Sequence, residues 1–141
     1  YDLRMMLEAF AAQRAASRIG EARLNELTDL CGRMEALLGA DTDVDKLAEL
    51  NAEFHGIVRE ATRSTRLVAM LNAVVQLPLV MTTFHRYSPA DLRRSAGHHR
   101  ELVDALRARN ETWAGSVMHS HVAAAKSVLL REEPSDRGSE E

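Results

Sequence analysis

Hydrophobic residues recur at spacings of three and four along most of the 141-residue chain. This spacing places apolar side chains on one face of an α-helix. Runs of β-branched residues with alternating polarity, which would indicate strands, do not occur. We therefore predict an all-α protein, an antiparallel bundle of about six helices.

Local signals divide the periodic stretches into helices. Gly20 and Gly39 follow the first two stretches, as is typical at helix ends. Ser88 and Pro89 together make an N-cap followed by proline at the first helical position. The predicted helices cover residues 1–19, 21–38, 43–61, 66–87, 88–109 and 111–131.

For two of these helices we also predict which residues are buried. On the first, the predicted stripe at spacings of three and four consists of Leu3, Leu7, Phe10, Ala11 and Arg14. The helix over 66–87 is apolar nearly all round, so we expect it to be buried or to lie at a subunit contact. Pro78 falls inside it and is expected to kink it, because proline removes a backbone donor.

The chain reads as one helical domain over residues 1–131, followed by a disordered polar tail over 132–141. It begins inside a helical pattern without Met, so we expect a further segment to precede it. No run of eighteen apolar residues and no signal-peptide pattern is present. The formal charge of -3 gives no basic surface for nucleic acid, and the single cysteine, Cys31, suits a reducing cytoplasm.

Polar residues interrupt the apolar stripes of three helices. Asn51 and His55 are one turn apart and share the stripe of the third helix. His99 lies on the stripe of the fifth helix and His121 on that of the sixth. A buried polar group without a partner costs roughly 1–3 kcal/mol, so these four side chains are expected to find partners in the bundle.

These inward side chains suit a metal ion. Helix bundles build metal sites from residues on facing helices. Three imidazoles and an amide oxygen favour Zn²⁺ or Ni²⁺, with Mn²⁺ less favoured. The alternative is a set of hydrogen-bonded core histidines, because the spacing of His55, His99 and His121 matches no short metal motif.

Four segments together resemble a known family. RMMLEAFAA (4–12) is similar to R-x-x-L-E-x-x-A-A, and LNAEFH (50–55) to D-x-x-F-H. HRELVDAL (99–106) is similar to H-R-x-I-x-x-A-I, and AGSVMHSHV (114–122) to A-x-x-x-M-x-x-H-I. The chain thus resembles, over nearly its whole length, the FCD domain, the effector-binding domain of the FadR subgroup of GntR-type transcription regulators.

The resemblance implies a bundle of the shorter, VanR-like variety around a metal and a small-molecule cavity. By position, the metal ligands would be Asn51, His55, His99 and His121. Asn51 stands where the family pattern has Asp, so the site would carry one negative charge less. The family also implies a carboxylate effector (a hydroxy acid or sugar acid), a homodimer, and an N-terminal winged helix-turn-helix that binds DNA.

Two further residues are candidates for effector binding. Arg4 matches the arginine of the family's first segment, and its guanidinium fork suits a carboxylate. Its alternative role is an ion pair with Glu8, one turn later. Ser95 lies one turn before His99, where it would contact the effector or, alternatively, bond its own helix backbone.

Two other functions remain as rivals. A three-histidine metal site can activate water, as in a hydrolase or hydratase. We expect no enzyme, because the sequence indicates no inward carboxylate near the histidines that would serve as general base. The second rival is a metal-free helical interaction domain with hydrogen-bonded histidines.

Overall fold

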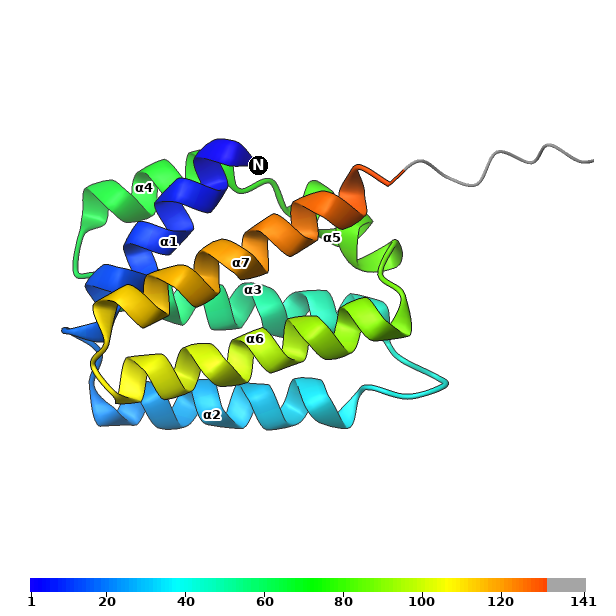
Figure 1. The fold of residues 1–141 in the computed structure, drawn as a ribbon, viewed down its shortest axis with the longest axis horizontal. Helices are drawn as coiled ribbons and strands as arrows, with labels where there is room; N and C mark the ends of the chain where they lie inside the picture. The colour runs from blue at the N-terminus through cyan, green and yellow to red at the C-terminus, as the bar shows by residue number, and fades with distance from the viewer. Residues whose placement is uncertain (132–141) are drawn as a thin grey trace, which may run out of the picture.

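The computed structural model describes residues 1–131, and this part of the chain is all α-helical, as predicted (Figure 1). The predicted tail, residues 132–141, lies outside the described residues. Seven helices occupy the described range: α1 Asp2–Ala16, α2 Glu21–Ala36, α3 Val44–Ala61, α4 Thr65–Val74, α5 Leu77–His85, α6 Pro89–Arg107 and α7 Glu111–Leu129.

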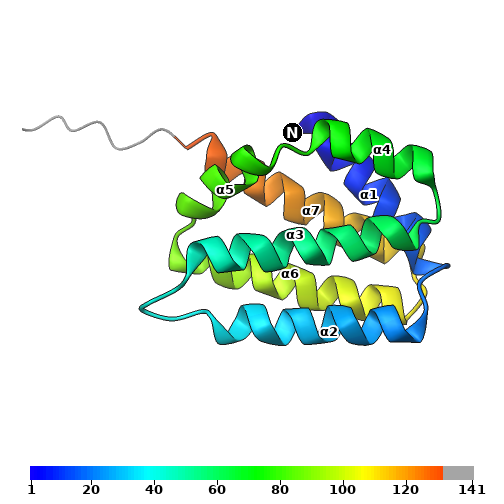
Figure 2. The same cartoon turned by 180° about the vertical axis from the view of Figure 1, so that it is seen from behind.

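The long helices form the body of the bundle. α6 packs against α2 on one side and α7 on the other, and α2 also packs against α3 (Figures 1 and 2). α1 packs along α7 and contacts α3, while α4 lies at the outer edge against α1. The main apolar core extends through this assembly, with Phe54, Val58 and Leu106 fully buried within it, and a smaller cluster lies between α1 and α4.

Side-chain caps fix the predicted helix starts. The Asp43 carboxylate accepts a hydrogen bond from the Lys46 backbone N–H at 2.9 Å, which starts α3. At the start of α6, the Ser88 hydroxyl accepts from the Asp91 N–H while the Asp91 carboxylate accepts from the Ser88 N–H. Such caps satisfy backbone donors that a helix leaves free, and they depend only on local sequence.

The predicted single helix over 66–87 is wrong, because the chain breaks there into α4 and α5. The two helices meet at an angle of 57°. Val75 has extended backbone angles (φ -84°, ψ 108°), as does Gln76 (φ -98°, ψ 112°). Pro78 lies in the first turn of α5, where its missing N–H costs nothing, so proline starts a new helix instead of kinking a continuous one.

The inward face of α1 also differs from the prediction. Leu3 and Phe10 are about half exposed, at 53% and 51%, although they belong to the predicted inward stripe. The buried face of α1 consists of Arg4, Glu8, Ala11, Ala12, Ala15 and Ala16. Small alanines let α1 approach α7 closely, and the same face carries two charged residues into the interior.

Among the described residues, no single helix has both the length and the apolar character needed to cross a bilayer. The bent pair α4 and α5 meets the criterion of length and composition only when the two helices are counted together.

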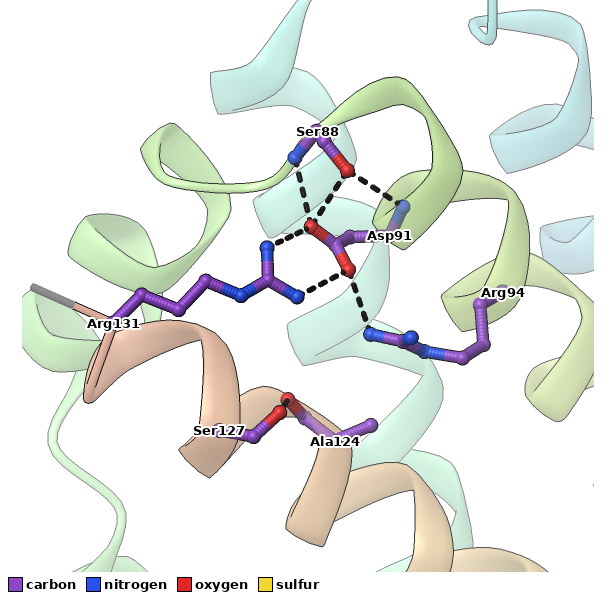
Figure 3. Close-up of polar contacts among 6 residues, drawn as sticks. All are labelled: Ser88, Asp91, Arg94, Ala124, Ser127 and Arg131. Carbon is purple, nitrogen blue, oxygen red and sulfur yellow. Dashed lines mark hydrogen bonds and ion pairs between the residues drawn. The ribbon is translucent and has the colours of Figure 1, made fainter. Parts of the chain in front are cut away.

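An ion-pair cluster joins the start of α6 to the end of α7 (Figure 3). Asp91 is buried, and its carboxylate accepts hydrogen bonds from Arg131 at 2.7 and 3.0 Å and from Arg94 at 2.7 Å. The hydrogen bonds from Arg131, together with those from Ser88, hold the pKa of Asp91 well below its ordinary value despite burial. This carboxylate therefore ties together two helix ends that are forty residues apart.

Replacing Asp91 by Asn is expected to lower the free energy of unfolding at pH 7 by about 1–2 kcal/mol, because it weakens the cap and removes the charged partner of Arg131. The native pKa is depressed, so this stability is complete above the unfolded pKa of about 4 and is lost as the pH falls towards the native value. Urea unfolding of wild type and variant at pH 7 and pH 3 measures this contribution to the free energy of unfolding.

The difference in free energy of unfolding between wild type and Asp91→Asn should therefore be smaller at pH 3 than at pH 7. Asp104→Asn, an exposed change on the same helix, is the matched control and should leave stability nearly unchanged. An equal difference in free energy of unfolding at both pH values would contradict the ionic role of Asp91.

Candidate metal centre

Three histidines from three helices meet in the bundle interior. His55 comes from α3, His99 from α6 and His121 from α7, and they are 1%, 2% and 7% exposed. One nitrogen of each ring lies within 4.8 Å of the nitrogens of the other two. The structure thus brings together the three histidines that the sequence placed on inward stripes.

The spacing of two of these nitrogens suits a tetrahedral ion. Nε2 of His55 is 3.3 Å from Nε2 of His121. For Zn–N bonds of 2.0–2.1 Å, tetrahedral geometry places neighbouring ligand nitrogens about 3.3–3.4 Å apart. The same distance also fits a hydrogen bond between the two rings, so the geometry suits both a metal and a metal-free pair.

Several buried polar atoms of this group have no hydrogen-bond partner. They include both ring nitrogens of His99, Nδ1 of His121 and Oδ1 of Asn51. Asn51 is 3% exposed and lies one turn before His55 on α3. Buried polar atoms are normally paired, so these unpaired atoms are ones that a metal or ligand could contact. Ligation by Asn51 stays a prediction.

Burial keeps the three imidazoles neutral. It lowers the pKa of His99 and His121 well below the ordinary value, and the neighbouring histidines lower both pKa values further. Burial also lowers the pKa of His55, although the nearby Glu8 opposes that shift. Neutral imidazole is the form that binds metal ions, so the site is ready for ligation at neutral pH.

A buried carboxylate lies beside the histidines, contrary to the expectation of none. Glu8 is 0% exposed, and its Oε2 lies 3.4 Å from Nδ1 of His55. Its Oε1 accepts a hydrogen bond from Nη2 of Arg59 at 2.5 Å. Burial raises the pKa of Glu8, but the contacts with His55 and Arg59 outweigh burial and hold this pKa well below its ordinary value.

The sequence did carry a signal for Glu8. It lies on the same side of α1 as Ala11, Ala12 and Ala15, which form the small-residue face of that helix. Interpretation of the larger Leu3 and Phe10 as the inward stripe placed Glu8 on the wrong side.

Arg4 is buried beside the same carboxylate. Its Nε lies 3.6 Å from Oε1 of Glu8 and makes no hydrogen bond of normal length. Its guanidinium also lies over the ring of Tyr1, 5.4 Å from the ring centre. The predicted ion pair between Arg4 and Glu8 therefore exists, while effector binding by Arg4 stays a prediction.

Ser95 lies next to His99 at the wall of a small void. The side chain is 7% exposed, and the void, about 10 Å³, also touches Phe84, Leu38 and Leu92. A larger cavity of about 560 Å³ opens at the bundle end between the α2–α3 loop and the start of α6. Leu38 and Leu92 line both spaces, so the outer cavity and the void beside His99 are neighbours that share these two side chains.

Comparison with known proteins gives two kinds of match. The sequence profile of the FCD domain family matches residues 1–124. Among solved structures, a GntR protein from Streptococcus agalactiae is 28% identical, with a TM-score of 0.68 over 89% of this chain and 56% of that chain. McbR/YncC of E. coli is 20% identical, with a TM-score of 0.73 over 89% of this chain and 62% of that chain, a likeness of fold alone.

The chain therefore spans less than two thirds of either of these solved chains. A comparison with curated proteins gave no match.

His99→Leu is expected to stabilise the metal-free chain by about 1 kcal/mol, because it removes a buried imidazole with no hydrogen-bond partner and fills the space with apolar atoms. Thermal unfolding after chelation measures the effect. His119→Leu, an exposed change on α7, is the control and should not raise the midpoint. A clear loss of stability in His99→Leu would mean that His99 serves the core instead of a ligand.

Proposed function

The chain belongs to the FCD domain family, and we propose that it senses a small carboxylate through a bound divalent metal and controls DNA binding by a GntR-type regulator. FCD domains are regulatory domains of transcription factors and not a family of enzymes. In the full-length regulator, a winged helix-turn-helix N-terminal to this domain would bind operator DNA in the cytoplasm. The subgroup that the sequence suggests is the VanR-like branch of the FadR regulators.

The convergence of His55, His99 and His121 carries this proposal. Three neutral imidazole nitrogens within 4.8 Å form a ready donor set for a divalent ion. Asn51 would add an amide oxygen from the next turn of α3. Three imidazole nitrogens and an amide oxygen suit Zn²⁺, our first candidate, or Ni²⁺, whereas Mn²⁺ prefers oxygen-rich octahedral sites.

An excess of buried positive charge supports an anionic effector. Arg4 and Arg59 are permanently charged guanidinium groups that share one carboxylate, Glu8. The three groups leave a net charge of about +1; Arg59 is partly exposed, whereas Arg4 is buried and its Nε has no hydrogen-bond partner, which is costly. A carboxylate that contacts Arg4 would balance this charge, while Ser95 and a metal held by the histidines would orient the hydroxyl groups of a hydroxy acid or sugar acid.

Effector entry would require movement at the bundle end. The void beside His99 and Ser95 has room for about one water molecule, so a sugar acid fits only after the leucines that it shares with the outer cavity move apart. Leu38 lies in the α2–α3 loop, two residues after the end of α2, and Leu92 belongs to α6, so opening would move this loop relative to α6. An effector that prefers the opened arrangement would bias the attached DNA-binding domains by linkage.

The homodimer would form through an exposed apolar face on α1 and α4. Leu3, Met6 and Phe10 are spaced three and four apart on α1 and are 53%, 67% and 51% exposed. Met70, on the adjacent α4, is 52% exposed. These four residues, here termed the α1–α4 face, carry no charge, so two copies can pack against each other about a two-fold axis without opposing like charges.

The first test is elemental analysis of the tag-free 141-residue chain before and after chelation. We expect about one divalent ion per chain, mainly Zn²⁺, and a loss of more than tenfold in metal affinity for His121→Ala. His119→Ala lies two residues away on α7 and is exposed, so it is the matched control and should keep the metal. A chain without metal and insensitive to chelator would favour the metal-free interaction domain.

A thermal-shift screen of hydroxy acids and sugar acids then tests sensing. A hit should raise the unfolding midpoint of the metal-loaded chain and lose most of its effect in Arg4→Gln, while Arg4→Gln keeps the metal. An equal shift in wild type and Arg4→Gln would exclude the proposed role of Arg4.

Phe10→Asp is expected to convert the dimer to a monomer, because it places two buried like charges on the α1–α4 face of the assembly. Light scattering after size exclusion should give twice the 15.7 kDa chain mass for wild type and the single mass for the variant. Leu130→Asp, on a side chain that is 66% exposed at the end of α7, is the control. A Phe10→Asp dimer would place the interface elsewhere.

A further inference from the structure

Arg59 holds the carboxylate of Glu8 so that Glu8 can only accept a hydrogen bond from its other neighbour, His55. Both of its oxygens face Arg59: Oε1 accepts from Nη2 at 2.5 Å, and Oε2 is 3.5 Å from Nε. Oε2 also lies 3.4 Å from Nδ1 of His55. A guanidinium only donates hydrogen bonds, so it requires the oxygens of Glu8 as acceptors and keeps the carboxylate in its ionised form.

The carboxylate in turn determines which nitrogen of His55 carries the proton. An ionised carboxylate can only accept, so the hydrogen bond from His55 requires a proton on Nδ1. Neutral imidazole has one N–H, so Nε2 of His55 is then a bare lone pair. That nitrogen faces His121 and the centre of the three-histidine group.

The same reasoning predicts which nitrogen of His121 carries the proton. Nε2 of His121 lies 3.3 Å from the bare Nε2 of His55, so the proton of that contact belongs to His121. Nδ1 of His121 is buried without a partner, as a bare nitrogen would be. In the metal-free chain a directed series of donors thus runs from His121 to His55 to Glu8, and His121 would have to move its proton from Nε2 to Nδ1 before Nε2 could bind an ion. Of these two rings, His55 has the lone pair that is set in advance by a charged neighbour.

We propose that Glu8 is a positioning residue for the metal site: it holds His55 in the Nδ1–H form, which leaves Nε2 free for a divalent ion. This inference rests on the metal site proposed above. Glu8 does not itself need to touch the ion.

Glu8→Gln distinguishes this role from simple packing, because the amide has nearly the same shape but two different ends. Arg59 requires an acceptor, so the amide oxygen should face Arg59 and the NH₂ group should face His55. Nδ1 of His55 must then accept, which moves its proton to Nε2. That proton points at the proposed metal position and blocks ligation.

Two measurements test the proposal on the 141-residue chain. Long-range ¹H–¹⁵N NMR spectra of the metal-free chain report the tautomer of His55, expected as Nδ1–H in wild type and Nε2–H in Glu8→Gln. Competition with a chromophoric chelator gives the Zn²⁺ affinity, expected to fall about 10–100-fold in Glu8→Gln. Glu53→Gln removes the same charge from an exposed position two residues from His55 and should change neither result.

A rescue variant separates the tautomer from the charge. In Glu8→Gln/Arg59→Met the guanidinium of Arg59 is absent. The amide oxygen of Gln can then turn to accept a hydrogen bond from the Nδ1–H of His55. We expect the Nδ1–H form to return and most of the Zn²⁺ affinity with it. If Glu8→Gln does not fold, a variant with Met at both positions takes its place, since it removes the Glu8–Arg59 pair as a unit and breaks only the longer contact between Arg4 and Glu8. This apolar variant should show mixed tautomers and weakened Zn²⁺ binding.

The proposal is overturned if Glu8→Gln keeps the Nδ1–H form, or if the tautomer changes while Zn²⁺ affinity does not. A wild-type chain that binds no Zn²⁺ would instead refute the metal site. The tautomer measurement needs no metal, so it would still decide whether Glu8 controls His55.

Discussion

The ion pair between Glu8 and Arg59 is the interaction on which the interior of this bundle depends. A carboxylate without exposure needs a close counter-charge, and the 2.5 Å contact with Arg59 supplies it across the interface of α1 and α3. Arg59 follows His55 by one turn, so the pair fixes the helix that also carries a proposed ligand. α1 packs along α7 as well, which sets the position of His121 relative to both. A charged contact of two helices therefore determines the geometry of three.

Much of this arrangement could be predicted from sequence because the relevant signals are local. Helix starts at Asp43 and Ser88 follow from side chains that bond backbone groups three residues away. The inward direction of His55, His99 and His121 follows from their place in the 3.6-residue period of their own helices. The three histidines lie near the middle of their helices, and in a bundle inward residues at a similar height on facing helices come close together, as these three do.

The errors arose where a residue's role depends on a distant partner. α1 has two faces of comparable apolar character, and period alone cannot say which one meets the core. The small alanines around Glu8 pack on α7, whereas the larger Leu3 and Phe10 remain exposed. Likewise, the apolar run over 66–87 is consistent with one helix or two, and the extended residues Val75 and Gln76 at the turn carry no strong local signal. Glu8 was missed for the first of these reasons.

The small size of the void beside His99 has a consequence for the timing of a response. If the proposed effector enters past Leu38 and Leu92, a ligand larger than one water molecule would reach His99 only after these side chains move apart, so opening would precede binding. At low effector concentration the rate of association would rise in proportion to concentration. At high concentration it would level off at the rate of opening, which the protein alone determines. The packing of two leucines would then set the shortest delay between the appearance of an effector and a change in transcription.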